Sequence, residues 1–85
     1  MELLYAPSFV RRIKKLPKRL QDEIFEKIEL FKSNPKDISL KVHPLHGKFS
    51  GSYSFSISYE YRIIFEYQGK NNVILLDFGD HDVYK

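Results

Sequence analysis

Two adjacent segments near the middle of the chain constrain the fold most. Residues 53–58 alternate aromatic or aliphatic side chains with serines, which is the period of two expected of a strand with one buried face. Residues 61–67 are instead apolar on both faces, apart from Arg62 and Glu66. Because a strand that is apolar on both faces belongs in the middle of a sheet, we expect the two strands to pair and the second to be central.

Arg62 is the residue of this central strand that requires an explanation. A guanidinium cannot lose its charge, so inside a sheet it needs a carboxylate partner or an anionic ligand. The carboxylates available nearby in the sequence are Glu60, Glu66 and Asp77. The anion that best fits the guanidinium fork is phosphate. From the sequence, both a structural ion pair and a phosphate site remain open.

The segment before this strand pair predicts a short strand followed by two helices. Residues 3–5 predict the strand, and Ser8 is expected to cap a helix whose apolar positions are Phe9, Ile13 and Leu16. Pro17 is expected to open a second helix, because proline fits the first turn and disrupts a helix interior. The apolar stripe of the second helix consists of Leu20, Ile24, Ile28 and Phe31, and Ser33-Asn34-Pro35 ends it.

The chain closes with one more predicted strand. It runs from Val73 to Phe78, and Gly79 is expected to end it. A long polar connection, residues 34–52, separates the helices from the strand pair, and connections of this length are often functional. The order β-α-α-β-β-β over residues 1–85 predicts a single α+β domain, with a helical hairpin packed on one face of a small antiparallel sheet.

Composition narrows the setting in which the chain works. It has no cysteine, which rules out disulfides and thiolate metal sites and suits a reducing cytosol. No apolar run approaches the roughly 20 residues of a membrane span, and the first residues lack the pattern of a signal peptide. We therefore expect a cytoplasmic protein with no membrane partner.

Positive charge is concentrated in the first half of the chain. Residues 1–48 carry 11 Lys and Arg against 6 Asp and Glu. A basic block without an acid consists of Arg11, Arg12, Lys14, Lys15, Lys18 and Arg19. Such a block attracts phosphate backbones or an acidic partner protein, although a solvated helix face would give the same pattern.

Two of the three histidines are candidates for proton transfer. His43 precedes the strand pair and His81 follows the last strand, so both flank the sheet that carries Arg62. Imidazole titrates near ~6.5 and exchanges protons at neutral pH, whereas His46 is interpreted as structural. No compact His and carboxylate spacing predicts a metal site, and we expect no metal and no cofactor. Lys41 and Lys48 bracket the histidine loop and add positive charge to it.

Several segments together resemble one protein family. They are the K-x-H-x-L-x-G segment (Lys41, His43, Leu45, Gly47), the strand Tyr61-Arg62-Ile63-Ile64-Phe65, and the ending Gly79-Asp80-His81-Asp82-Val83-Tyr84. With the element order, they make essentially the whole chain similar to the RelE/ParE superfamily, the toxins of type II toxin–antitoxin modules. Within it, the chain looks most like the RelE-like branch that includes the YafQ and YoeB types. It differs from those types at Ser39, Ser56, Glu60 and Asp82.

The resemblance implies a ribosome-dependent endoribonuclease that cuts mRNA in the A site of the 70S ribosome, and a cognate antitoxin partner. The family's strand arginine corresponds to Arg62, its histidine before the L-x-G turn to His43, and its C-terminal histidine to His81. Cleavage by the RNA's own 2′-OH needs a base, a cation at the phosphate and an acid for the leaving oxygen. We assign Arg62 to the phosphate, His81 to the acid and His43 to the base, which Glu60 replaces or assists. The residues expected to contact mRNA and 16S rRNA are Arg11, Arg12, Lys14, Lys15, Lys41, Lys48 and Tyr84.

Two other functions are compatible with the same resemblance. One is a ParE-like inhibitor of DNA gyrase without nuclease activity, and the other is an inactive binding protein with the toxin fold. The set of His43, Arg62 and His81 favours the nuclease, because pure inhibition needs no titratable constellation. For the toxin, an acidic antitoxin segment is expected to bind the helical hairpin, residues 8–32.

Overall fold

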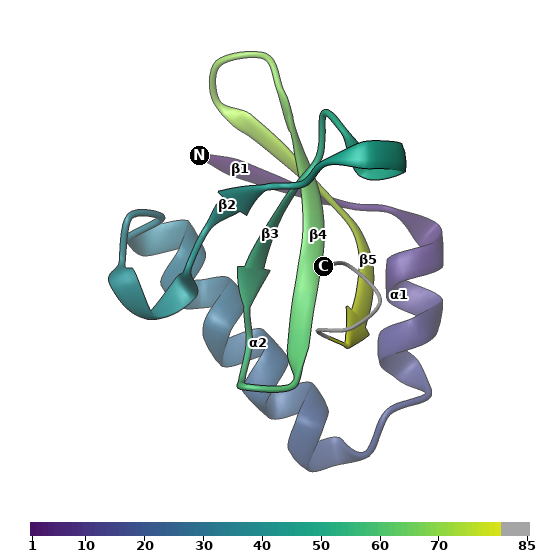
Figure 1. Cartoon of the computed structure of the whole chain (residues 1–85). Coiled ribbons are helices and arrows are strands. Elements are labelled where there is room, and N and C mark those ends of the chain that lie inside the picture. Colours follow the sequence, from purple (N-terminus) through teal and green to yellow (C-terminus); the bar gives the residue numbers. More distant parts are fainter. Residues whose placement is uncertain (81–85) are drawn as a thin grey trace.

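The computed structural model describes residues 1–80, in which helices cover one face of a five-stranded sheet (Figure 1). The elements in chain order are β1 (Glu2–Tyr5), α1 (Pro7–Lys14), α2 (Lys18–Ser33), a 3₁₀ turn η1 (Ile38–Leu40), β2 (His43–Pro44), a second 3₁₀ turn η2 (Gly47–Phe49), β3 (Tyr53–Ser56), β4 (Tyr61–Gln68) and β5 (Asn72–Asp80). Figure 1 shows α2 crossing behind β3 and β4, with α1 next to β5. The predicted α+β class and the helix pair on one face are confirmed.

The sheet is mixed, so the expectation of a wholly antiparallel sheet needs correction. The strand order is β1-β5-β4-β3-β2, which makes β4 central as predicted. Strands β2 to β5 pair antiparallel, but β1 pairs parallel with β5, with Leu3 opposite Val73. The Ala6 N–H donates to the Leu75 carbonyl at 3.0 Å and continues this pairing to the start of α1. The helical hairpin returns the chain so that its first strand lies beside its last, which no local pattern reveals.

The helix boundaries differ from the prediction at the first cap. Helix α1 begins at Pro7, with Ala6 as the N-cap and no side-chain capping bond. The Ser8 hydroxyl instead donates to the carbonyl of Leu76 at 3.3 Å. Proline therefore starts this helix, and Ser8 joins it to β5. The break at Pro17 is confirmed, because Pro17 occupies the N-cap of α2.

The main core lies between the helices and the sheet. Phe31 of α2 stacks on Phe55 with ring centroids 4.5 Å apart and lies 4.9 Å from Phe65. The predicted stripe positions Ile24 and Ile28 are also buried in this cluster. The alternation on β3 and β4 therefore turns one set of side chains toward the helices and the other set toward the opposite face.

Strand β5 continues past its predicted end and contains an irregularity. It runs through Gly79 to Asp80, because Gly79 pairs with Arg62 of β4 and remains part of the ladder. The register shifts opposite Ile64 and Phe65, so that Leu75 faces Phe65 while Asp77 faces Ile64. This extra residue moves Asp77 to the face away from the helices, as β-bulges commonly re-aim side chains.

Neither described helix has the length and apolar character needed to cross a membrane.

Candidate functional site

The sheet face away from the helices carries most of the polar strand residues. Cross-strand partners point to the same face, and the pairings align His43 with Ser54, Ser54 with Ile64, and Ile64 with Asp77. The next row aligns Ser56, Arg62 and Gly79. We call this surface the polar face and define it by His43, Ser54, Ser56, Arg62 and Asp77. It brings two residues predicted from the sequence, His43 and Arg62, to one surface in neighbouring rows.

Ser54 lies between the two predicted residues. It is the register partner of His43, and its hydroxyl oxygen accepts a hydrogen bond from Arg62 Nη1 at 3.5 Å. Ser54 is fully buried while Arg62 is half-buried. The hydroxyl therefore holds one end of the guanidinium against the sheet.

Two of the carboxylates considered as partners of Arg62 also contact other residues. Glu66 Oε2 accepts a hydrogen bond from the Ser52 hydroxyl at 2.9 Å. Asp77 Oδ1 lies 3.3 Å from Arg12 Nη1. Since Arg12 belongs to α1, this ion pair links the basic helix to the polar face. The structure thus places Arg12, which was predicted to contact RNA as part of the basic block, next to the face that carries Arg62.

The side-chain contact of His43 identifies which ring nitrogen can act as a base. The imidazole is exposed, and Nδ1 lies 2.9 Å from the Lys41 carbonyl oxygen. A carbonyl oxygen only accepts hydrogen bonds, so Nδ1 carries the proton in this contact. In the neutral ring, Nε2 then has the free lone pair. His43 is oriented by backbone and presents Nε2 as the proton acceptor.

Glu60 is not brought together with these residues. It lies in the turn between β3 and β4, where its N–H donates to the Ser58 hydroxyl at 3.4 Å. It lines a cavity of about 570 Å³ with Leu20 and Glu23 of α2. This cavity lies toward the face of the sheet that the helices cover, whereas His43 and Arg62 lie on the polar face. The structure therefore offers no support for Glu60 as a second base.

The remaining predicted residues are distributed over the surface. Lys48 is exposed, with Nζ 5.7 Å from the ring centroid of Phe49, and Phe49 packs on the small cluster of Leu45 and Ile64 on the polar face. Exposed positions on or just after α1 are Arg11, Lys14 and Lys15, and Lys41 is exposed after η1. His81 and Tyr84 lie outside the described residues.

Two residues of the polar face were not recognised as site residues from the sequence. Ser54 belongs to a run of serines that was interpreted only as the polar half of an alternating strand. Asp77 was considered only as a partner of Arg62, because its pairing with Arg12 depends on the irregularity in β5. The signal for Ser54 in the sequence was its position in the alternation, which marks a face but not a contact. Asp77 had no such signal, because the irregularity in β5 changes the face on which it lies.

No arrangement that favours a metal is present in the part of the chain that the structure describes. Within residues 1–80, no group of three or more His, Cys, Asp or Glu side chains is placed to hold a metal ion. The polar face instead combines the Arg62 guanidinium with the Ser54 and Ser56 hydroxyls, which suit an anion such as phosphate, while its Asp77 carboxylate is paired with Arg12.

Comparisons with known proteins give matches in structure but not in sequence. No family model and no curated protein matches the chain. The YoeB/ParE toxin from Agrobacterium tumefaciens is similar with a TM-score of 0.75 and 22% identity, over 95% of this chain and 99% of that chain. YafQ from E. coli is similar with a TM-score of 0.77 and 19% identity, over 96% and 94%. The archaeal RelE–RelB complex from Pyrococcus horikoshii is similar with a TM-score of 0.73 and 19% identity, over 93% and 92%.

Proposed function

We propose that this chain, which has the fold of RelE/ParE-like toxins, is the toxin of a type II toxin–antitoxin system and cleaves mRNA on the ribosome. The observation that carries the proposal is the common surface of His43 and Arg62 on the polar face. A gyrase inhibitor would not require an oriented imidazole on the same sheet face as a guanidinium.

The proposed chemistry uses the RNA's own 2′-hydroxyl as the nucleophile. Nε2 of His43 takes the proton of the 2′-OH, and the 2′-oxygen forms a bond to the adjacent phosphorus. Arg62 stabilises the negative charge that builds on the phosphate oxygens. The bond to the 5′-oxygen breaks, and that oxygen takes a proton from a general acid, for which we propose His81. The products are a 2′,3′-cyclic phosphate and a 5′-hydroxyl.

The basic residues extend the site toward helix α1. Arg12 adjoins the polar face through Asp77, and Arg11, Lys14 and Lys15 are exposed nearby in the sequence. We propose that they bind phosphates of 16S rRNA, whose negative charge attracts such clusters. The ribosome then supplies the in-line geometry that a small protein cannot impose on a flexible strand by itself.

A cleavage assay with purified protein tests this function. We expect cuts in mRNA on translating 70S ribosomes, at the codon in the A site, and far slower cutting of the same RNA without ribosomes. The cut ends should be 2′,3′-cyclic phosphate and 5′-hydroxyl. Intact mRNA, together with loss of gyrase supercoiling activity, would contradict the proposal and favour the gyrase inhibitor.

The partner that neutralises the toxin is proposed to bind an apolar groove on the helices. A cavity of about 340 Å³ is lined by Tyr5, Phe9 and Val10 around the start of α1 and by Phe25 of α2, with Lys14 beside them. Phe25 is 50% exposed, and Tyr5 and Val10 are also exposed. The apolar floor and basic rim fit an acidic amphipathic segment of an antitoxin. The similar YafQ and P. horikoshii RelE structures include complexes with DinJ and RelB, which supports an antitoxin partner.

Hydrogen exchange of the complex with the antitoxin from the same operon checks this placement. We expect added protection over residues 8–32, and Phe25→Asp should weaken binding about tenfold or more because it puts a charge in the apolar groove. Tyr59→Asp is the matched control, since Tyr59 is 96% exposed and does not line this groove. Protection confined to residues 41–67 would indicate that the antitoxin plugs the polar face instead.

A further inference from the structure

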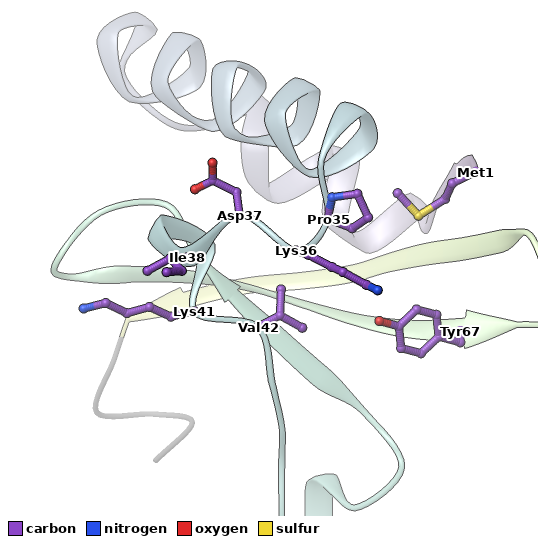
Figure 2. Close-up of a pocket in the computed structure, with 8 residues that line it drawn as sticks. All are labelled: Met1, Pro35, Lys36, Asp37, Ile38, Lys41, Val42 and Tyr67. Atoms are coloured by element: carbon purple, nitrogen blue, oxygen red, sulfur yellow. The ribbon is translucent and has the colours of Figure 1, made fainter.

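A third cavity adjoins the loop that carries His43. Its volume is about 510 Å³, and it lies between the segment after α2 and strand β4. Its lining includes Lys36, Ile38, Lys41, Val42 and Tyr67. Figure 2 shows Lys36 and Tyr67 extending to one side of this cavity, and Ile38 and Lys41 to the other. The proposed chemistry on the polar face uses none of this lining except the exposed charge of Lys41.

Tyr67 places in the cavity an aromatic ring that is fixed by neighbouring rings but still accessible to solvent. It is 51% exposed. Its ring makes edge contacts with Tyr53, at 4.9 Å and 74°, and with Phe65, at 5.4 Å and 84°. Burial, and then the neighbouring Tyr53, raise the pKa of Tyr67, so the phenol keeps its proton at neutral pH. The ring is thus a preoriented flat surface that also carries a hydrogen-bond donor.

The charges around the ring favour an anionic chain. Lys36 and Lys41 line the cavity. Asp37 also lines it, but its carboxylate accepts a hydrogen bond from the Ser39 N–H at 2.9 Å, and Figure 2 shows it turned away from Tyr67. Hydrogen bonds from the side chain and backbone of Ser39 lower the pKa of Asp37. The Asp37 carboxylate is therefore engaged within its own loop. Lys36 supplies positive charge on the side of the cavity that holds Tyr67, and Lys41 supplies it on the other side.

The cavity is connected to the polar face by three successive residues. Lys41 is the one non-glycine residue with positive φ among residues 1–80, at φ 50°. Its carbonyl contacts His43 Nδ1, while its neighbour Val42 lines the cavity. Because successive side chains of an extended chain alternate in direction, Val42 and His43 point to opposite sides of the chain here. Strand β2 is the last in the sheet order, so a bound chain can pass around this edge from one side to the other.

We propose that this cavity binds one unstacked base of a single-stranded RNA, with the base on Tyr67 and the flanking phosphates on Lys36 and Lys41. The RNA then continues around the β2 edge to His43 on the polar face. Single-stranded RNA is bound in this way by aromatic side chains with cations beside them. The inference rests on the proposed function in that it identifies part of the RNA path. An acidic peptide is the competing occupant, but it makes little use of a flat, held ring.

Binding of an RNA that cannot be cut tests the proposal without any catalysis. The probe is a fluorescent six-nucleotide RNA, fully 2′-O-methylated, and the readout is its Kd from anisotropy at fixed salt. Tyr67→Ala is expected to raise the Kd about tenfold, because stacking on one base is lost, whereas Tyr67→Phe keeps the ring and should stay within about twofold. Lys36→Glu should raise the Kd and flatten its salt dependence. Lys70→Glu makes the same charge change in the exposed β4–β5 turn and is the matched control.

The outcomes separate this inference from the proposed nuclease. If Arg62→Ala still binds the probe and Tyr67→Ala weakens that binding further, the cavity acts independently of the cleavage site. If the unchanged protein binds the probe through Tyr67 but cuts no RNA on ribosomes, the result would support the proposed base-binding cavity and overturn only the proposed nuclease activity. A folded Tyr67→Ala variant with unchanged Kd would overturn the inference. So would Tyr67-dependent binding of an acidic leucine-containing peptide without RNA binding, which would make the cavity a protein-docking site.

Discussion

Arg62→Ala is expected to lower ribosome-dependent RNA cleavage by about 100- to 1000-fold, the loss typical of removing one group that stabilises developing charge. The guanidinium lies half-buried on the central strand, with Nη1 3.5 Å from the Ser54 hydroxyl. It is thus held at one surface with His43 before any RNA arrives. Rates of cutting on 70S ribosomes give the loss, and circular dichroism shows whether the variant is folded.

Two control variants make this result specific to the guanidinium fork. Arg62→Lys keeps the charge but loses the bidentate geometry, so its activity should fall between that of Arg62→Ala and the unchanged protein. Lys70→Ala removes a positive charge from an exposed turn and should cut normally. A folded Arg62→Ala variant with full activity would exclude Arg62 from the reaction. An unfolded one would show that its role is structural.

Phe31→Ala is expected to destabilise the fold by about 3–5 kcal/mol, as is typical for deleting a buried phenylalanine. Phe31 is 0% exposed, and its ring contacts both Phe55 and Phe65, so it joins α2 to β3 and β4. A domain of 85 residues has a total free energy of unfolding of about 4–13 kcal/mol. The substitution therefore removes a large part of it, and urea denaturation followed by circular dichroism measures the loss.

Phe25→Ala is the matched control on the same helix. Phe25 is 50% exposed, so its truncation should cost about 1 kcal/mol or less, because it leaves no enclosed cavity. Similar losses from both substitutions would mean that α2 does not pack on the sheet through Phe31. Since Phe25 lies in the proposed antitoxin groove, the same variant should weaken antitoxin binding while remaining stable.

Much of the fold is visible in the sequence because periodicity is a local property. The spacing of Ile24, Ile28 and Phe31 predicted a helix with one buried stripe, and all three are in the core. The alternation of residues 53–58 predicted a strand with one buried face. The strand is confirmed over Tyr53–Ser56, but Ser54 on its other face is also fully buried. The strand that contains Arg62 and is otherwise apolar on both faces was expected to be central, and β4 is central.

Part of the candidate site follows from the same local patterns. Alternation along one strand determines that Arg62 and Glu66 share a face, and the histidine loop lies directly before that strand pair. The sequence thus selected His43 and Arg62. Their meeting on one surface also required the short strand β2 and its pairing with β3, which was not predicted because residues 34–52 were interpreted as a connection. It did not identify Ser54 as their common neighbour, because a hydrogen bond of one serine among several depends on the exact register.

Only the tertiary structure decided the relations between segments far apart in the chain. The parallel pairing of β1 with β5, the irregularity that turns Asp77 toward Arg12, and the position of Glu60 beside α2 all depend on how distant segments align. The cap at Ala6 and the continuation of β5 through Gly79 likewise depend on partners across the sheet. The periods of helices and strands arise from the covalent geometry of neighbouring residues. They can therefore be recognised in a short segment of sequence without knowing its tertiary contacts. Register and facing partners are set by the packing free energy of the whole domain, which no short stretch of sequence contains.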